Sequence, residues 1–232
     1  MVSVFGLLDG ITASGIVLSS AIFGLLSFYR ARKLGAKLLG WAGLTMFFVG
    51  FLWLGPTVDF FMVLLTSSNI TPIWYYSLFS YTWVAPALVV AMYLGGSLMF
   101  PKKKWWIVSI FIILGLIFEY FLYFQNAYSF DYELLSPGED LIDANFVRTY
   151  YTFFFVVIFL LSALILLGIG FLIKAKQATG ELRKKFIYLA IGFIIFVACG
   201  ALDSVLTIPV AIGFVRVVMM TFALWMYLGL KS

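Results

Sequence analysis

Long runs of apolar residues alternate with short polar segments along this chain. A helix of about 20 apolar residues crosses the hydrocarbon core of a membrane, which is about 30 Å thick. Seven runs reach that length, at residues 4–29, 38–65, 73–100, 105–124, 149–173, 186–206 and 212–230. No basic segment precedes the first run, which favours a retained span over a cleaved signal peptide. The pattern therefore predicts an all-α integral membrane protein, in which residues 1–232 form a single domain of seven transmembrane helices.

The composition supports this fold class. Hydrophobic residues make up 64% of the 232 residues and charged residues only 11%, which is more apolar than the surface of a soluble domain allows. The formal charge of +5 raises the question of nucleic acid binding. Most of the cations, however, cluster in short segments between the apolar runs, as they do in proteins that span a membrane. We therefore predict a lipid bilayer as the environment and no nucleic-acid partner.

The distribution of cations also predicts an orientation. Most cations follow the odd-numbered runs, at Arg30, Arg32, Lys33, Lys37, Lys102, Lys103, Lys104, in the segment 174–185 and at Lys231. The positive-inside rule then places the N-terminus outside and the C-terminus in the cytoplasm of a multi-pass protein of the cell membrane. The segment 125–148 becomes an extracellular loop, rich in acids and aromatic residues. It is expected to be either a solvated loop with interfacial aromatics or a short cap that packs onto the bundle.

Five ionisable residues lie inside or at the ends of the runs. At ~1.5 Å per helical residue, Asp9, Asp59 and Asp203 come close to the outer interface, Arg216 lies about one turn deeper, and Glu119 is the deepest. Ionisable side chains within a membrane are candidates for function. We therefore predict an outward-facing polar pocket for an unknown small ligand, in which Arg216 pairs with Asp203 or Glu119, and Glu119 ranks ahead of Asp203. Alternatively, the three aspartates simply occupy helix ends among the lipid headgroups, where charge costs little.

Several kinds of chemistry lack their residues in this sequence. The chain has no histidine and one cysteine, Cys199, so neither an intrachain disulfide nor a metal centre built on His or Cys is expected. The seventh run contains no lysine to which retinal could attach. Phosphate-binding loops and catalytic triads are absent as well. We expect no cofactor, no metal and no enzymatic activity.

One stretch resembles a known family. The segment 174–185, with its Ala-Thr-Gly-Glu-Leu-Arg-Lys-Lys centre, precedes a glycine-bearing span that ends in Asp203. This part of the chain resembles the last third of the seven-span membrane domains attached to microbial sensor histidine kinases. The resemblance implies a sensory or signal-relaying membrane module. Because no kinase part follows in this sequence, its output would pass through a protein partner in the membrane or at the cytoplasmic face.

Weak internal similarity suggests a duplication. The tetrapeptide Met-Tyr-Leu-Gly occurs in both the third and the seventh run, and the spacing from Arg30 to Asp59 equals that from Lys174 to Asp203. Spans one to three and five to seven have the same expected orientation. A parallel three-plus-one-plus-three arrangement of helices is therefore possible, as in some small transporters.

Two functions follow as hypotheses. The first is a non-enzymatic receptor-like, sensory or accessory membrane protein with an outward-facing polar pocket. The second is a small-solute transporter of the three-plus-one-plus-three arrangement. Pro56 and Pro86 interrupt runs two and three and predict kinks, because proline removes a helical hydrogen bond and clashes with the preceding turn. As gating kinks they motivate, together with the possible duplication, the transporter hypothesis; a static kink is the alternative.

Overall fold

A computed structural model of the chain describes residues 2–206 and 208–231 and contains seven helical spans, each long and apolar enough to cross a membrane. The seven predicted spans are thereby confirmed. In order, they are α1 (Val4–Leu34); α2 (Lys37–Gly50) with the 3₁₀ segment η1 (Phe51–Trp53) and α3 (Leu54–Thr66); α4 (Trp74–Tyr81) with α5 (Val84–Met99); α6 (Lys104–Phe124); α8 (Tyr151–Ala163) with the π-helical segment η2 (Leu164–Ile169) and α9 (Gly170–Gln177); α10 (Gly180–Asp203); and α11 (Pro209–Leu230). Between α6 and α8 lie α7 (Asn126–Ser129) and two strands, β1 (Phe130–Glu133) and β2 (Asp143–Phe146).

Three helices, α1, α9 and α10, extend beyond the predicted runs into basic sequence. The first continues to Leu34 and ends at Gly35, whose left-handed backbone, with φ of 66°, closes the helix. The segment 174–185, expected as a loop, is almost entirely helical, because α9 reaches Gln177 and α10 begins at Gly180. Lysine and arginine are good helix formers, so a prediction from the apolar run alone underestimates the length of a helix that projects into water.

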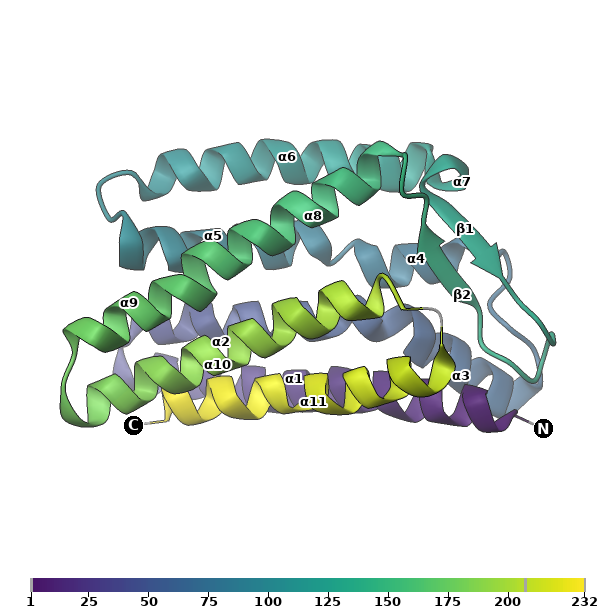
Figure 1. Cartoon of the computed structure of the whole chain (residues 1–232), viewed down its shortest axis with the longest axis horizontal. Coiled ribbons are helices and arrows are strands. Elements are labelled where there is room, and N and C mark those ends of the chain that lie inside the picture. The colour runs from purple at the N-terminus through teal and green to yellow at the C-terminus, as the bar shows by residue number, and fades with distance from the viewer. Residues whose placement is uncertain (1, 207, 232) are drawn as a thin grey trace.

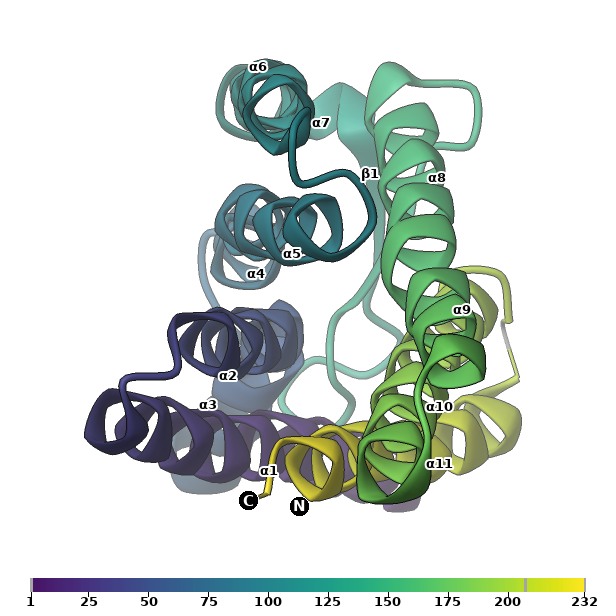
Figure 2. The same ribbon diagram turned by 90° about the vertical axis from the view of Figure 1, so that its left-hand side faces the viewer.

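The seven spans form a closed ring in sequence order. Each span packs against the one before it, and α11 returns to pack against α1. Seen from the end, the ring consists of two rows that meet where α1 lies beside α11 (Figure 2). The chain termini lie at opposite ends of the bundle (Figure 1). We call the end that carries β1 and β2 the hairpin end, and the opposite end, with the lysine- and arginine-rich turns, the basic end.

Proline interrupts two spans where the sequence predicts it. A proline removes the hydrogen bond to the carbonyl four residues earlier and clashes with it. Pro56 accordingly follows the 3₁₀ segment η1, and Pro86 follows the turn at residues 82–83 between α4 and α5. A third interruption, the π-helical segment η2, lies in span five and has no proline. The kinks expected at Pro56 and Pro86 are therefore confirmed, whereas the π segment was not anticipated.

Two backbone groups at the first break bind side chains. The N–H of Gly55 donates to Ser80 Oγ at 3.0 Å, and Thr57 Oγ1 donates to the Trp53 carbonyl at 2.8 Å. A Cβ at Gly55 would lie 2.3 Å from the Tyr76 carbonyl oxygen, so only glycine permits spans two and three to approach this closely. The break thus lies at a close contact between spans two and three.

Large apolar side chains fill the half of the bundle nearer the basic end. Six of them from six different elements are almost fully buried: Met46, Met92, Leu167, Phe171, Phe193 and Met226. The rings of Phe171 and Phe193 stack with centroids 5.8 Å apart. This cluster, which we call the apolar plug, belongs to the main hydrophobic core.

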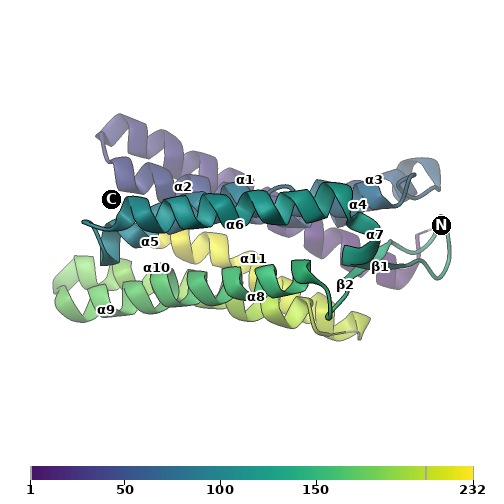
Figure 3. The ribbon, with the colours of Figure 1, turned by 90° about the horizontal axis from the view of Figure 1, so that it is seen from above.

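The segment between α6 and α8 folds onto the hairpin end as a cap. Strands β1 and β2 pair antiparallel, with Phe130 opposite Phe146, and add a small β-hairpin to the helical fold. The rings of both phenylalanines pack on Tyr81 of α4. Figures 1 and 3 show the hairpin crossing the end of the bundle from α7 toward α3 and the N-terminus. Of the two arrangements expected for residues 125–148, the packed cap is the one that the structure adopts.

A closed triangle of hydrogen bonds fixes the start of this cap. Tyr132 OH lies 2.6 Å from Ser77 Oγ and donates to Asn126 Oδ1 at 2.6 Å, while Asn126 Nδ2 donates to Ser77 Oγ at 2.7 Å. Burial raises the pKa of the Tyr132 hydroxyl above its ordinary value, although the bonds to Ser77 and Asn126 act in the opposite direction. The hydroxyl therefore stays protonated and remains a donor at neutral pH.

Asp59 fastens the far part of the cap. This side chain has no exposed surface, and its carboxylate accepts hydrogen bonds from Asn69 Nδ2 and from the backbone N–H groups of Ile70 and Ile142, at 2.8–3.0 Å. Asn69 in turn donates to the carbonyl of Asp140 at 2.9 Å. Asp59 thus links α3, the turn after it and the cap.

We expect Asp59→Asn to lower the free energy of unfolding by about 2–4 kcal/mol, because an amide NH₂ would replace an acceptor that faces buried donors. The measurement is unfolding of the purified protein in detergent, followed by fluorescence. The matched control is Asp131→Asn, which changes an exposed acid on β1. Equal stability of the two variants would contradict a fastening role for Asp59.

Candidate functional site

A cavity of about 150 Å³ lies inside the ring, beneath strand β2. Its walls come from spans two, three, five, six and seven, and its roof from residues 143–146 of the cap. Among the described residues, none from α1 or α6 lines it. Phe193, at the edge of the apolar plug, lies at its deep end. The cavity therefore occupies the hairpin half of the bundle, and the plug separates it from the basic end.

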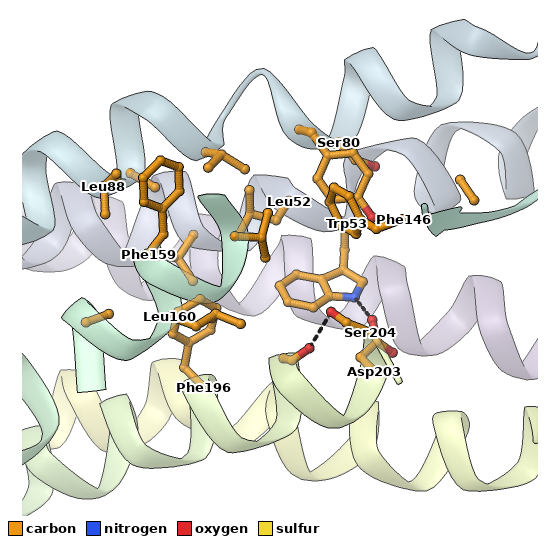
Figure 4. A pocket seen from close by; sticks show the side chains of 18 of the residues that line it. Leu52, Trp53, Ser80, Leu88, Phe146, Phe159, Leu160, Phe196, Asp203 and Ser204 are labelled. Atoms are coloured by element: carbon orange, nitrogen blue, oxygen red, sulfur yellow. Dashed lines mark hydrogen bonds between the residues drawn. The ribbon is translucent and has the colours of Figure 1, made fainter. Parts of the chain in front are cut away.

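The two ends of the cavity differ in polarity. Figure 4 shows Asp203, Ser204, Trp53 and Ser80 toward the hairpin end, with the Trp53 indole nitrogen directed at Asp203. Toward the other end, the walls are apolar. They are formed by Leu88, Phe159, Leu160 and Phe196.

Three of the five lining spans are interrupted where they border the cavity. Leu52 and Trp53 of η1 line it, as do Tyr81 and Val84 on either side of the break in span three. Ala163, the last residue before η2, lines it as well. Irregular backbone at membrane depth is tolerated where it is buried in protein or borders a cavity, and π segments are often found at functional sites.

An ion-pair network closes the hairpin end of the cavity. Arg216 Nε donates to Asp203 Oδ1 at 2.7 Å, and Arg216 Nη1 donates to Asp9 Oδ1. Trp53 Nε1 donates to Asp203 Oδ2 at 3.2 Å. Arg216 is 9% exposed as a whole residue, so both carboxylates hold its guanidinium in a largely dry position. The network joins α1, α10, α11 and the 3₁₀ joint of span two.

The structure brings three of the five predicted site residues together. The predicted pair of Asp203 and Arg216 is present, and Asp9 joins it from α1. Asp203 and Arg216 also line the cavity, whereas Asp9 contacts it only through Arg216. The predicted alternative pair, Arg216 with Glu119, does not form.

Asp59 and Glu119 lie elsewhere. Asp59 is sealed beneath the cap by the three donors described above and does not line the cavity. Glu119 lies on α6, one turn after Gly115, which packs against Ala85 of α5. Both of its carboxyl oxygens are buried and lack a hydrogen-bond partner among the described residues, although the main chain at Ala85 provides a favourable electrostatic contact. The ranking of Glu119 ahead of Asp203 rested on depth along the helix, and depth does not fix the direction in which a side chain points.

Several lining residues were not singled out from the sequence. Trp53 and Tyr81 were hidden among many aromatic residues, but each lies within five residues of a proline that interrupts its span. Asp143 and Asn145 enter through β2, whose pairing with β1 is a tertiary result. The prolines could thus have pointed to Trp53 and Tyr81 as lining residues, whereas no sequence signal pointed to the lining residues of the cap.

Neither a scan against protein-family models nor a search of the curated proteins finds a match for this chain. Within residues 2–206 and 208–231, no group of three or more His, Cys, Asp or Glu side chains is placed to hold a metal ion. The site therefore consists of an ion-pair network, an aromatic wall and a cavity of small-molecule size.

We expect Asp203→Asn to lower the free energy of unfolding by about 2–3 kcal/mol, because it leaves the buried Arg216 with Asp9 alone. Trp53→Phe removes one neutral donor and should cost only about 1 kcal/mol. Thermal and denaturant unfolding in detergent measure both. A larger loss for Trp53→Phe than for Asp203→Asn would contradict this order.

Proposed function

We propose that this chain is a non-enzymatic, receptor-like sensory or accessory membrane protein that binds a small ligand in the cavity. Binding would be relayed through the interrupted helices to a protein partner. The proposal rests on one observation: three spans are interrupted at the residues where they line the cavity. A ligand that contacts Trp53, Tyr81 or Ala163 contacts helix joints directly, and such joints absorb rotations that move the rest of a helix.

The apolar plug favours a receptor over a carrier. A carrier needs polar steps on both sides of its binding site so that the solute can leave by either face. The plug, from Met46 to Phe193 and Met226, provides large apolar side chains at 0–2% exposure instead. A signal can pass such packing as a helix movement, whereas a polar solute cannot.

The proposed orientation places the hairpin end outside the cell and the basic end in the cytoplasm, following the positive-inside rule. The lysines and arginines after the odd-numbered spans would then face the proposed partner. Ligand binding at one end and partner contact at the other also agree with the resemblance of residues 174–203 to the membrane domains of microbial sensor kinases.

A small-solute transporter stays as the second candidate because of one observation. Span four, α6, contributes nothing to the described lining of the cavity, and spans one to three meet spans five to seven at both edges of the ring. This is the geometry expected of two parallel three-helix units with one linking helix.

The relay of a helix movement from the cavity to the basic end is tested with a bulky side chain, placed in the cavity wall, that occupies the cavity in place of a ligand. Spin labels at Lys102 and Lys176, two exposed positions at the basic end, report the distance between spans three and five in a Cys199→Ala background. We expect Ala163→Phe, which adds bulk to the cavity, to shift that distance by at least about 2 Å. The control is Leu161→Phe, which changes a side chain on the outer face of the same helix. Equal distances in both variants would contradict the relay.

A flux assay separates the two candidates. Proteoliposomes that contain the full chain are tested with sugars, amino acids and monovalent cations against empty liposomes. We expect no uptake above the empty liposomes, because the plug blocks the path. Robust uptake that is lost in Ala163→Phe but kept in Leu161→Phe would overturn the receptor proposal and establish the transporter.

A further inference from the structure

The charges around the cavity do not balance. Asp203 and Asp143 line its hairpin end together with Arg216, and Asp9 shares that arginine. With all four groups ionised, three carboxylates face one guanidinium. Arg148, another cation at this end, donates to the Val205 carbonyl at 3.4 Å and does not line the cavity. The hairpin end of the cavity therefore carries an excess of negative charge.

The two lining carboxylates have unequal roles. Asp203 is committed to Arg216 and Trp53. Asp143 is exposed, accepts a hydrogen bond from Asn145 Nδ2 at 2.9 Å, and acts electrostatically on Asp203. No cation of the described chain pairs with Asp143. A positive ligand group near Asp143 would offset the excess charge without disturbing the Arg216 network.

The lining does not favour a divalent inorganic cation. Calcium takes six to eight oxygen ligands and magnesium an octahedral set. The described residues provide no group of three or more acidic, histidine or cysteine side chains for such an ion. They provide aromatic side chains instead, from Trp53, Tyr76, Tyr81 and Phe146. Aromatic faces attract organic ammonium groups.

The volume of the cavity and its apolar end determine the part of the ligand that is not the cationic group. A cavity of about 150 Å³ has room for an apolar group of the size of a benzene ring. The walls farther from Asp143 are apolar, at Leu88, Phe159 and Phe196. A ligand that fits both ends joins one cationic group to one apolar group of about ring size.

We propose that the cavity binds a small protonated amine that bears a single ring-sized apolar group, with its ammonium toward Asp143 and Asp203 and its apolar group against Phe159 and Phe196. This inference rests on the proposed function, because it names the ligand class of the same cavity. The helix relay does not depend on it, since the relay is tested with a side chain as the filler.

Four probes test the ligand class on the full chain in nanodiscs, by calorimetry with empty nanodiscs as the reference. They are 2-phenylethylammonium, the neutral 2-phenylethanol, the anionic 3-phenylpropionate, and ethylammonium, which lacks the ring. We expect 2-phenylethylammonium to bind at least tenfold more tightly than each of the other three. Binding of the alcohol or the carboxylate as tight as that of the amine overturns the ligand class, as does the absence of binding by the amine.

Two variants locate the ligand. Asp143→Asn should reduce the preference for the amine over the alcohol at least threefold, while Asp131→Asn, on the exposed side of the hairpin, should leave it unchanged. Ala163→Leu should weaken the binding of 2-phenylethylammonium and 2-phenylethanol alike, because it fills the apolar end. An unchanged preference in Asp143→Asn, in a protein that unfolds at the wild-type temperature, overturns the proposed position of the ammonium. Failure of these tests with a positive spin-label result would reject the ligand class and leave the receptor proposal standing.

Discussion

The structure depends on the requirement that every backbone polar group within the apolar bundle find a partner inside the protein. Pro56 breaks this pattern in span two, and side chains bind backbone groups at the break: Ser80 accepts from the Gly55 N–H, and Thr57 donates to the Trp53 carbonyl. Spans two and three touch at Gly55, which leaves no room for a side chain there. Trp53, the last residue of η1, lies at the same break and donates across the bundle to Asp203. The break in one helix is therefore directly connected to the ion-pair network and to the wall of the cavity.

Much of the fold follows from the sequence because the length and polarity of each run are dictated by the membrane alone. Seven runs predict seven helices, and the two proline kinks follow from the chemistry of the ring. The C-terminus of α1 and the N-terminus of α10 were harder to predict, because the polar segments Arg30–Lys33 and Glu181–Lys185 favour helix as strongly as the apolar residues do. The cap was harder still. Its strands are four residues each and gain their order from contacts with α3 and α4 that are remote in sequence.

The site was predictable in part, and the two aspartates at matching spacings show why. Asp59 and Asp203 each follow a basic pair by the same number of residues and lie at the same end of the bundle. Backbone and amide donors of the cap surround Asp59, so it serves as a structural fastener. Arg216 and Trp53 surround Asp203, so it borders the cavity. Sequence spacing fixes depth, but the partners across the bundle decide the role, and these partners are set by packing.

The pairing of Asp9 with Arg216 also bears on biosynthesis. The two residues are separated by 207 positions, and the ring closes only when α11 reaches α1. At about 5–20 residues per second, roughly 10–40 s pass between the synthesis of Asp9 and that of its cation. By the end of this interval six spans have been synthesised, and the first of them carries, near its N-terminus, an acid whose cation is only then being made. The Asp9–Arg216 pair can therefore form only after the last helix has been inserted, and a chain that stops before α11 leaves Asp9 without its cation.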